Sequence, residues 1–181
     1  MLVWAADTTV PGVPNFHQVD QFIYRGGQPA AAGWDSLARL GVKTVIDLRL
    51  ESEHSADVEQ RAVEAAGMHY VGVPMKGMVA PTDEQVSKVL ALFEDSSAGP
   101  VFVHCRRGSD RTGTVVGCYR VAHDHWGNRQ AFEEAKSYGM SWTQVGLKHY
   151  LLNFQTEMQS AAAGPAPQNT AAAPLQAAGQ P

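Results

Sequence analysis

The residues with the clearest chemical potential lie between His104 and Thr112, where a cysteine and an arginine are separated by five residues. An apolar run at residues 101–103 precedes this segment, and a helix-compatible stretch follows it. A loop between a strand and a helix start gathers unpaired backbone N–H groups, and the helix dipole adds partial positive charge. We therefore expect the loop to bind an anion and the Cys105 thiol to ionise more readily than a free cysteine. The thiolate is nucleophilic, so Cys105 is a candidate for covalent catalysis.

The pattern His104-Cys105, five residues, then Arg111-Thr112-Gly113 resembles the signature loop of the cysteine-dependent protein tyrosine and dual-specificity phosphatases. The resemblance implies hydrolysis through a cysteinyl-phosphate, with no metal or organic cofactor. Cys105 would be the nucleophile, and Arg111 would hold two phosphoryl oxygens with its planar fork. His104 would support the thiolate, and the Thr112 hydroxyl would donate a hydrogen bond to the sulfur. The phosphate would be surrounded by Arg106, Arg107, Gly108, Ser109, Asp110 and Arg111.

The proton donor is the point at which this sequence departs from the usual pattern. Most members of the family carry an aspartate on a mobile loop before the cysteine, but the corresponding loop here, residues 73–81, has no carboxylate. We favour Asp110 as the general acid, because the bacterial-type Cys-x4-Asp-Arg loop resembles that of myotubularin-type lipid phosphatases and some secreted bacterial phosphatases. The alternative role for Asp110 is an ion pair that shapes the loop. Asp83 is the alternative acid, although the N-terminus of a helix would stabilise its charged form.

The class of substrate follows less directly from the residues. Protein phosphotyrosine and phosphoserine or phosphothreonine are the substrates that we favour. Arg106 and Arg107 add two cations to the loop, so a phosphoinositide or inositol phosphate is the alternative. We also considered Arg49 and Lys76 as residues of the pocket rim.

Two other classes of function compete with a phosphatase. The missing acid on the upstream loop is compatible with a catalytically weak phosphate-binding module. A rhodanese-like sulfur transferase also uses a loop thiolate after a strand, but it lacks the His-Cys and Arg-Thr-Gly frame. Hydrolysis of para-nitrophenyl phosphate that is lost in Cys105→Ser would favour the phosphatase.

The elements that position this loop alternate between strand and helix. This order indicates an α/β fold with a small, mostly parallel central sheet flanked by helices, as in dual-specificity phosphatases. Residues 113–122 are apolar on nearly all sides, which predicts a buried helix. Capping boxes are predicted at residues 82–85 and 141–144. We predict strands at residues 22–24, 42–48, 68–73 and 101–103, and helices at residues 29–40, 52–66, from 82, 113–122, 128–138 and from 141.

Composition sets the remaining limits. The chain of 181 residues is 44% hydrophobic, which suits one phosphatase domain at residues 15–158. Residues 1–14 are predicted to form an irregular lead-in, and the Ala- and Pro-rich residues 159–181 a disordered tail. The net charge of −4 gives no support to nucleic-acid binding. No stretch is apolar enough for stable membrane insertion, and we expect a monomer.

The two cysteines and the N-terminus carry further limits. Cys105 and Cys118 have no zinc-type spacing, so we predict no metal site; Cys118 is expected in the core. Residues 1–7 resemble the end of a secretory signal, which leaves cytoplasmic and exported locations both open.

Overall fold

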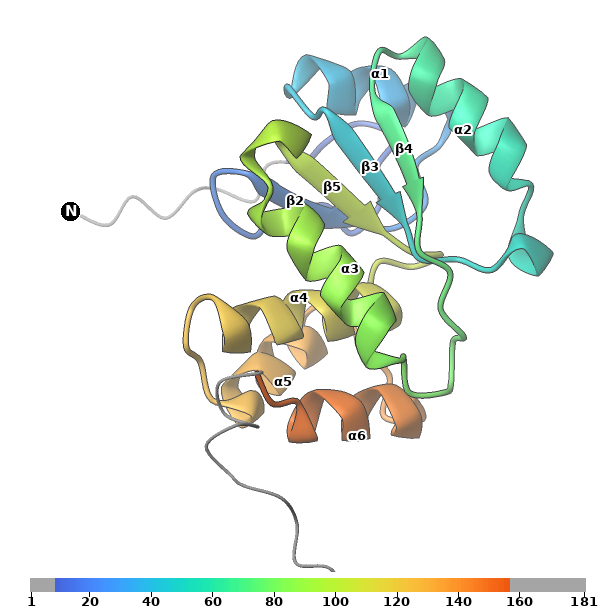
Figure 1. Cartoon of the computed structure of the whole chain (residues 1–181). Coiled ribbons are helices and arrows are strands. Elements are labelled where there is room, and N and C mark those ends of the chain that lie inside the picture. The colour runs from blue at the N-terminus through green and yellow to red at the C-terminus, as the bar shows by residue number, and fades with distance from the viewer. Residues whose placement is uncertain (1–8, 157–181) are drawn as a thin grey trace, which may run out of the picture.

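The computed structural model describes residues 9–156, which form an α/β fold around a five-stranded sheet (Figure 1). The strand order is β1-β2-β5-β3-β4. The beginning of the predicted lead-in, residues 1–8, and the predicted tail, residues 159–181, lie outside the described residues. The mostly parallel sheet flanked by helices confirms the predicted fold class.

The central strands are parallel and end at one edge of the sheet. His104, the last residue of β5, pairs with Gly26 at the end of β2 and with Asp47 at the end of β3. Polar residues that follow these strands therefore meet at this edge, where open α/β sheets bind ligands. The strands are β2 (Ile23–Gly26), β3 (Thr44–Asp47), β4 (His69–Gly72) and β5 (Val101–His104), with the short β1 (His17–Gln18) antiparallel to β2.

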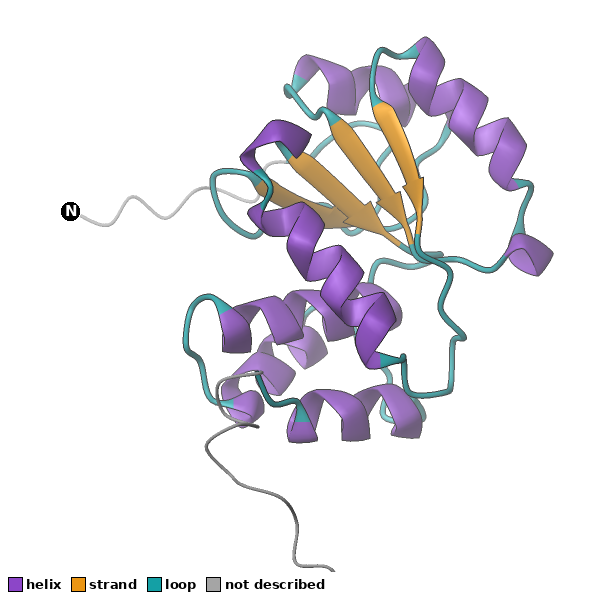
Figure 2. Ribbon diagram, in the orientation of Figure 1, coloured by secondary structure: helices purple, strands orange, loops and turns teal. Residues whose placement is uncertain are grey.

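Helices cover both faces of the sheet (Figure 2). The helices α1 (Ala31–Arg39) and α2 (Ala56–Ala65) lie on one face, and α3 (Asp83–Glu94) and α4 (Asp110–Ala122) lie on the other. The helices α5 (Asn128–Ser137) and α6 (Val145–Asn153) pack against α4. As predicted, α4 is buried on nearly all sides. No helix of the described residues combines the length and hydrophobicity that crossing a membrane requires.

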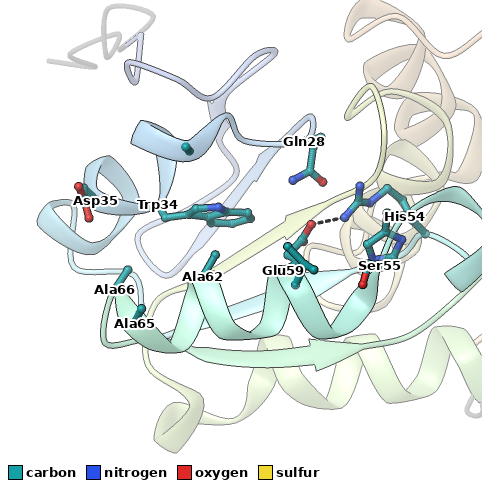
Figure 3. Close-up of a pocket in the computed structure, with 12 residues that line it drawn as sticks. Gln28, Trp34, Asp35, His54, Ser55, Glu59, Ala62, Ala65 and Ala66 are labelled. Carbon is teal, nitrogen blue, oxygen red and sulfur yellow. Dashed lines mark hydrogen bonds and ion pairs between the residues drawn. The ribbon is translucent and has the colours of Figure 1, made fainter.

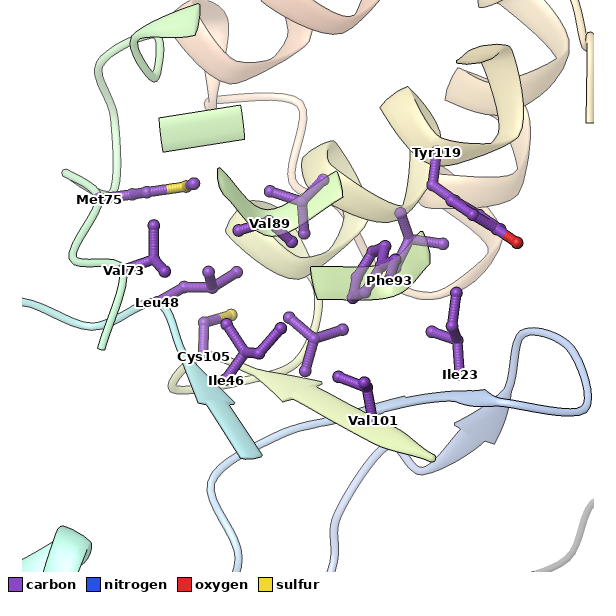
Figure 4. Close-up of a cluster of buried hydrophobic side chains, with 13 residues drawn as sticks. Ile23, Ile46, Leu48, Val73, Met75, Val89, Phe93, Val101, Cys105 and Tyr119 are labelled. Carbon is purple, nitrogen blue, oxygen red and sulfur yellow. The ribbon is translucent and has the colours of Figure 1, made fainter. Parts of the chain in front are cut away.

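Alternating residues of the buried strands supply two cores. Val45 and Phe102 point toward α1 and α2, whereas Ile46 and Val103 point toward α3 and α4. Figure 4 shows the second of these clusters, with Cys105 at its edge. The predicted nucleophile, Cys105, is therefore held by the core of the domain.

The two predicted capping boxes had different outcomes. Thr82 Oγ1 accepts from the Gln85 N–H, and Gln85 Oε1 accepts from the Thr82 N–H, so the first box starts α3 as predicted. The second prediction was wrong, because α6 begins only at Val145. The Ser141 hydroxyl instead lies 2.8 Å from that of Thr143.

Candidate active site

The loop between β5 and α4 turns tightly around Cys105, whose buried side chain lines a pocket of about 310 Å³. Gly108 has a φ of +72°, a conformation that other residues rarely adopt. A Cβ atom at this position would lie 2.3 Å from the carbonyl carbon of Gly26. The turn therefore requires glycine. The pocket is lined by Glu53, Gly77, Cys105, Arg106, Arg107, Asp110, Arg111 and Gln144.

Arg25 of β2 holds the loop around Cys105 by a hydrogen bond to the loop backbone. The sequence did not reveal this role of Arg25. Its Nη2 donates to the carbonyl oxygen of Gly108 at 2.8 Å, and its guanidinium lies 4.5 Å from the ring centroid of Tyr138. Burial lowers the pKa of Arg25 to about 10. Asn15 Nδ2 donates to the carbonyl oxygen of Arg107 at 3.2 Å. These contacts attach the loop to the sheet and to the preceding chain.

Arg111 is held by Glu53, which lies in the 3₁₀ turn Glu51–Glu53 after β3. Nη1 and Nη2 of Arg111 donate to the two Glu53 oxygens at 2.5 and 2.9 Å, and Nη1 also donates to the carbonyl oxygens of Leu48 and Met75. Burial acts to lower the pKa of Arg111. The hydrogen bonds to Glu53, together with the charges of Cys105 and Glu53, raise this pKa above its ordinary value. The arginine is thus oriented before any substrate binds.

Asp110 lies in the pocket at the first position of α4. Its Oδ2 accepts from Arg107 Nη2 at 2.5 Å, and its Oδ1 accepts from the Ser141 N–H at 2.8 Å. The loop-shaping ion pair is therefore present, on a carboxylate that also lines the pocket. The structure does not bring Asp83 to this pocket. Its carboxylate accepts from the Tyr150 hydroxyl at 2.8 Å and lines a separate cavity.

The other predicted loop residues differ in what they offer to a ligand. Arg106 and Arg107 are exposed and line the pocket, whereas the Ser109 side chain is buried and accepts a 3.4 Å hydrogen bond from Asn15. Thr112 Oγ1 is buried and has no hydrogen-bond partner among the described residues, so the expected bond to the sulfur is not formed. Burial raises the pKa of the Cys118 thiol, which lies in the core as predicted.

A buried polar network surrounds His104, the residue that precedes Cys105. Arg49 donates to both oxygens of Asp47, at 3.0 and 2.9 Å, and pairs with Glu59. The Nε2 atom of His104 lies 3.0 Å from Glu59 Oε1, close but not aligned as a hydrogen bond. Burial opposes ionisation of Asp47, yet the hydrogen bonds from Arg49 hold the pKa of Asp47 below its ordinary value. His104 thus lies beside charged groups, and its supporting role stays a prediction.

This network forms the polar end of a second cavity, of about 600 Å³, between α1 and α2 (Figure 3). Arg49, which we considered as a rim residue, lines this cavity and is not among the residues that line the pocket around Cys105. Asp47, Glu59 and His104 offer ligand atoms within 4.8 Å of one another. Arg49 already binds both oxygens of Asp47 and one oxygen of Glu59, so we assign the group to an ion-pair network.

Glu53 and Gln144 contribute to the pocket two side chains that the sequence did not reveal. Gln144 precedes α6, and its Oε1 is buried without a hydrogen-bond partner among the described residues. Both residues lie far from the Cys105 loop along the chain. The sequence placed Gln144 in a predicted capping box, whereas the structure places it in the pocket.

Comparison with known proteins gives concordant matches. Residues 9–149 match a family described as "DSP-PTPase phosphatase fused to NAD+ Kinase". A putative tyrosine-protein phosphatase, OCA1 of Mycosarcoma maydis, is 32% identical over 144 residues, covering 78% of this chain and 87% of the relative. The inositol diphosphatase DSP2 of rice (Oryza sativa subsp. japonica) is 29% identical over 157 residues, covering 84% and 74%.

The fold has solved counterparts. The crystal structure of Pseudomonas aeruginosa TpbA superimposes with a TM-score of 0.70 at 24% identity, covering 86% of this chain and 94% of TpbA. A variant of TpbA has been solved in complex with pTyr. The relatives come from fungi, plants and bacteria.

Proposed function

The chain belongs to the DSP-PTPase phosphatase family and is a hydrolase, and we propose that it dephosphorylates tyrosine and serine or threonine residues of proteins. One observation carries this proposal: the Cys105 thiol lines the same pocket as Arg111, whose guanidinium is held by Glu53. The bacterial subtype indicated by the Cys-x4-Asp-Arg loop stays a prediction.

The reaction that we propose has two displacements. The Cys105 thiolate attacks phosphorus and forms an S–P bond, while the P–O bond to the leaving group breaks and the leaving oxygen takes a proton. Water then attacks phosphorus, gives up a proton and releases phosphate and the thiolate. Loop N–H groups and the start of α4 stabilise the equatorial oxygens in both steps.

The geometry of Arg111 supports its role as the phosphate clamp. Its hydrogen bonds to the described residues all come from Nη1 and Nη2. The edge formed by Nε and Nη2 is therefore the one assigned to two phosphoryl oxygens, because a guanidinium binds such groups with paired N–H donors. The bond to Glu53 fixes the plane of this edge.

We assign the general acid to Asp110. Glu53 and Asp110 are the two carboxylates that line the pocket. Both oxygens of Glu53 bind the buried Arg111, whereas Asp110 binds the exposed Arg107 and one backbone N–H, that of Ser141. Asp110 would donate to the leaving oxygen in the first step and accept a proton from water in the second. Its partner Arg107 has an exposed side chain, so this ion pair is screened and can open when substrate binds.

An inositol phosphate is the second candidate substrate. The observation in its favour is that Arg106 and Arg107 both line the pocket, where they would meet further phosphates. The relative named as an inositol diphosphatase supports this reading, whereas the tyrosine and dual-specificity phosphatases support a protein substrate.

Phosphate release distinguishes these functions. We expect hydrolysis of para-nitrophenyl phosphate and of a phosphotyrosine peptide, both abolished in Cys105→Ser. Faster release from a soluble inositol diphosphate than from any phosphopeptide would favour the second candidate. Binding of phosphate without turnover would contradict both and indicate a phosphate-binding module.

A further inference from the structure

Four large apolar side chains are exposed on two segments beside the catalytic pocket. Met78 and Val79 follow β4 and are 66% and 55% exposed, and Trp142 and Val145 precede and begin α6 with 85% and 70% exposure. We call these four residues the apolar rim. Single exposed apolar residues are common in folded proteins, but a contiguous group marks a binding surface.

The two segments of the rim touch each other. A Cβ atom at Gly146 would lie 2.6 Å from the backbone nitrogen of Ala80 and 2.7 Å from the carbonyl oxygen of Met78. Figure 1 shows the loop after β4 running down to the N-terminal end of α6. Each segment also contributes one lining residue to the catalytic pocket, Gly77 and Gln144. The rim therefore lies at the pocket, not at a distance from it.

Folding does not account for these side chains. An apolar residue stabilises a fold by leaving water, and side chains that are 55% to 85% exposed do so only in part. The other large exposed apolar residues of the described chain, Phe22, Leu40 and Val58, lie in three separate parts of the chain. The loop that carries an acid in most related phosphatases here carries Met78 and Val79.

We propose that the apolar rim binds apolar or aromatic side chains that flank the phosphorylated tyrosine of a protein substrate. This inference rests on the proposed function and adds which residues the enzyme prefers on either side of the phosphotyrosine. The pocket supplies Arg111 for the phosphate, and the rim supplies apolar contact area immediately outside it. An inositol polyphosphate carries charged or hydroxyl groups on every ring carbon and would gain nothing from the rim.

The charge of the chain favours a peptide over a bilayer. The net charge is −4, so an anionic membrane would repel the protein as a whole. The exposed cations near the rim are Lys76, Arg106 and Arg107, and Arg107 is paired with Asp110. These cations fit a phosphorylated side chain as well as an inositol phosphate, so the apolar rim is the feature that favours the peptide.

The test compares two phosphotyrosine peptides of equal length and charge. One carries leucine or phenylalanine on both sides of the phosphotyrosine, and the other carries serine and glycine. We expect the full chain to prefer the apolar peptide in kcat/KM, mainly through KM. The preference should fall about tenfold in Trp142→Ala and, separately, in Met78→Ser, as expected for loss of one buried side chain. Phe22→Ala removes an equally exposed apolar residue elsewhere and should retain the preference.

The outcomes separate this inference from the proposed function. Equal kcat/KM for both peptides, with hydrolysis that depends on Cys105, would overturn the rim and leave the phosphatase intact. The rim proposal would also be overturned if the rim variants lost activity only on phosphoinositide in vesicles, because the rim would then contact lipid. Absence of Cys105-dependent hydrolysis of either peptide would instead contradict the proposed function. Thermal unfolding of each variant checks that it is folded.

Discussion

The Glu53 carboxylate holds the Arg111 guanidinium end-on, with distances of 2.5 Å from Oε2 to Nη1 and 2.9 Å from Oε1 to Nη2. The two residues are separated by 58 positions in the chain. The pair leaves free the Nε edge of Arg111, which is the edge that we assign to the phosphate in the proposed reaction.

Glu53→Gln should lower kcat/KM for para-nitrophenyl phosphate about 10- to 100-fold, because a mobile guanidinium no longer matches the phosphoryl oxygens. Steady-state kinetics measures this loss. Glu51→Gln, an exposed change in the same turn, is the matched control and should have little effect. Equal activity of the two variants would show that Glu53 does not orient Arg111.

The same pair should make stability depend on pH. The hydrogen bond from Arg111 lowers the pKa of Glu53, so the folded carboxylate binds its proton less readily than the unfolded one. The resulting stabilisation is fully present above the unfolded pKa of about 4.3 and is lost as pH falls through the lower folded value. Urea unfolding at several pH values should therefore give a difference between the wild type and Glu53→Gln that shrinks in acid. A difference that grew in acid would contradict the assignment.

Asp110→Asn should reduce kcat for a poor leaving group, such as phenyl phosphate, about 100-fold or more, because a general acid contributes roughly 10²- to 10⁴-fold. The loss should be smaller for para-nitrophenyl phosphate, whose leaving oxygen needs less protonation. Asp83→Asn should change neither rate, since Asp83 pairs with Tyr150 outside the pocket.

The variant Arg107→Gln distinguishes two roles of Asp110, that of general acid and that of partner in the ion pair with Arg107. It removes the partner of Asp110 while keeping the carboxylate, so the dependence on leaving group should persist. If Arg107→Gln reproduced the full loss seen in Asp110→Asn, the pair would shape the loop and Asp110 would not be the acid.

Gly108→Ala should destabilise the loop and abolish most activity, because its Cβ would lie 2.3 Å from the Gly26 carbonyl carbon at a φ of +72°. Chemical denaturation should show a loss of about 2 kcal/mol or more in the free energy of unfolding. Gly41→Ala is the control, since Gly41 has a φ of +91° and nothing within 4 Å of its Cβ position. It should show only the smaller backbone cost and retain activity.

Glu59→Gln should lower the free energy of unfolding by about 2 kcal/mol, because it removes one of two carboxylates that neutralise the buried Arg49. Urea denaturation measures the change. Glu64→Gln, on the exposed side of the same helix, should be nearly neutral. An equal effect of both substitutions would indicate a loss of helix charge rather than of the buried pair.

The amino-acid sequence by itself determined the elements whose signals are local. The turn at Gly108, the helix after Asp110 and the capping box at Thr82 depend on residues close together in the chain, and all were predictable. The spacing of Cys105 and Arg111 likewise carried the family resemblance, because the loop is one continuous segment.

Only the tertiary structure decided which distant side chains complete the site. Glu53 meets Arg111, Arg25 meets Gly108 and Glu59 meets His104 because parallel strands end at one edge of the sheet. The periodicity of apolar residues does not predict such contacts between distant side chains, because these contacts depend on strand order and helix packing. The same reason separates Asp83 from the pocket and turns Gln144 toward it, although both were read from similar capping patterns.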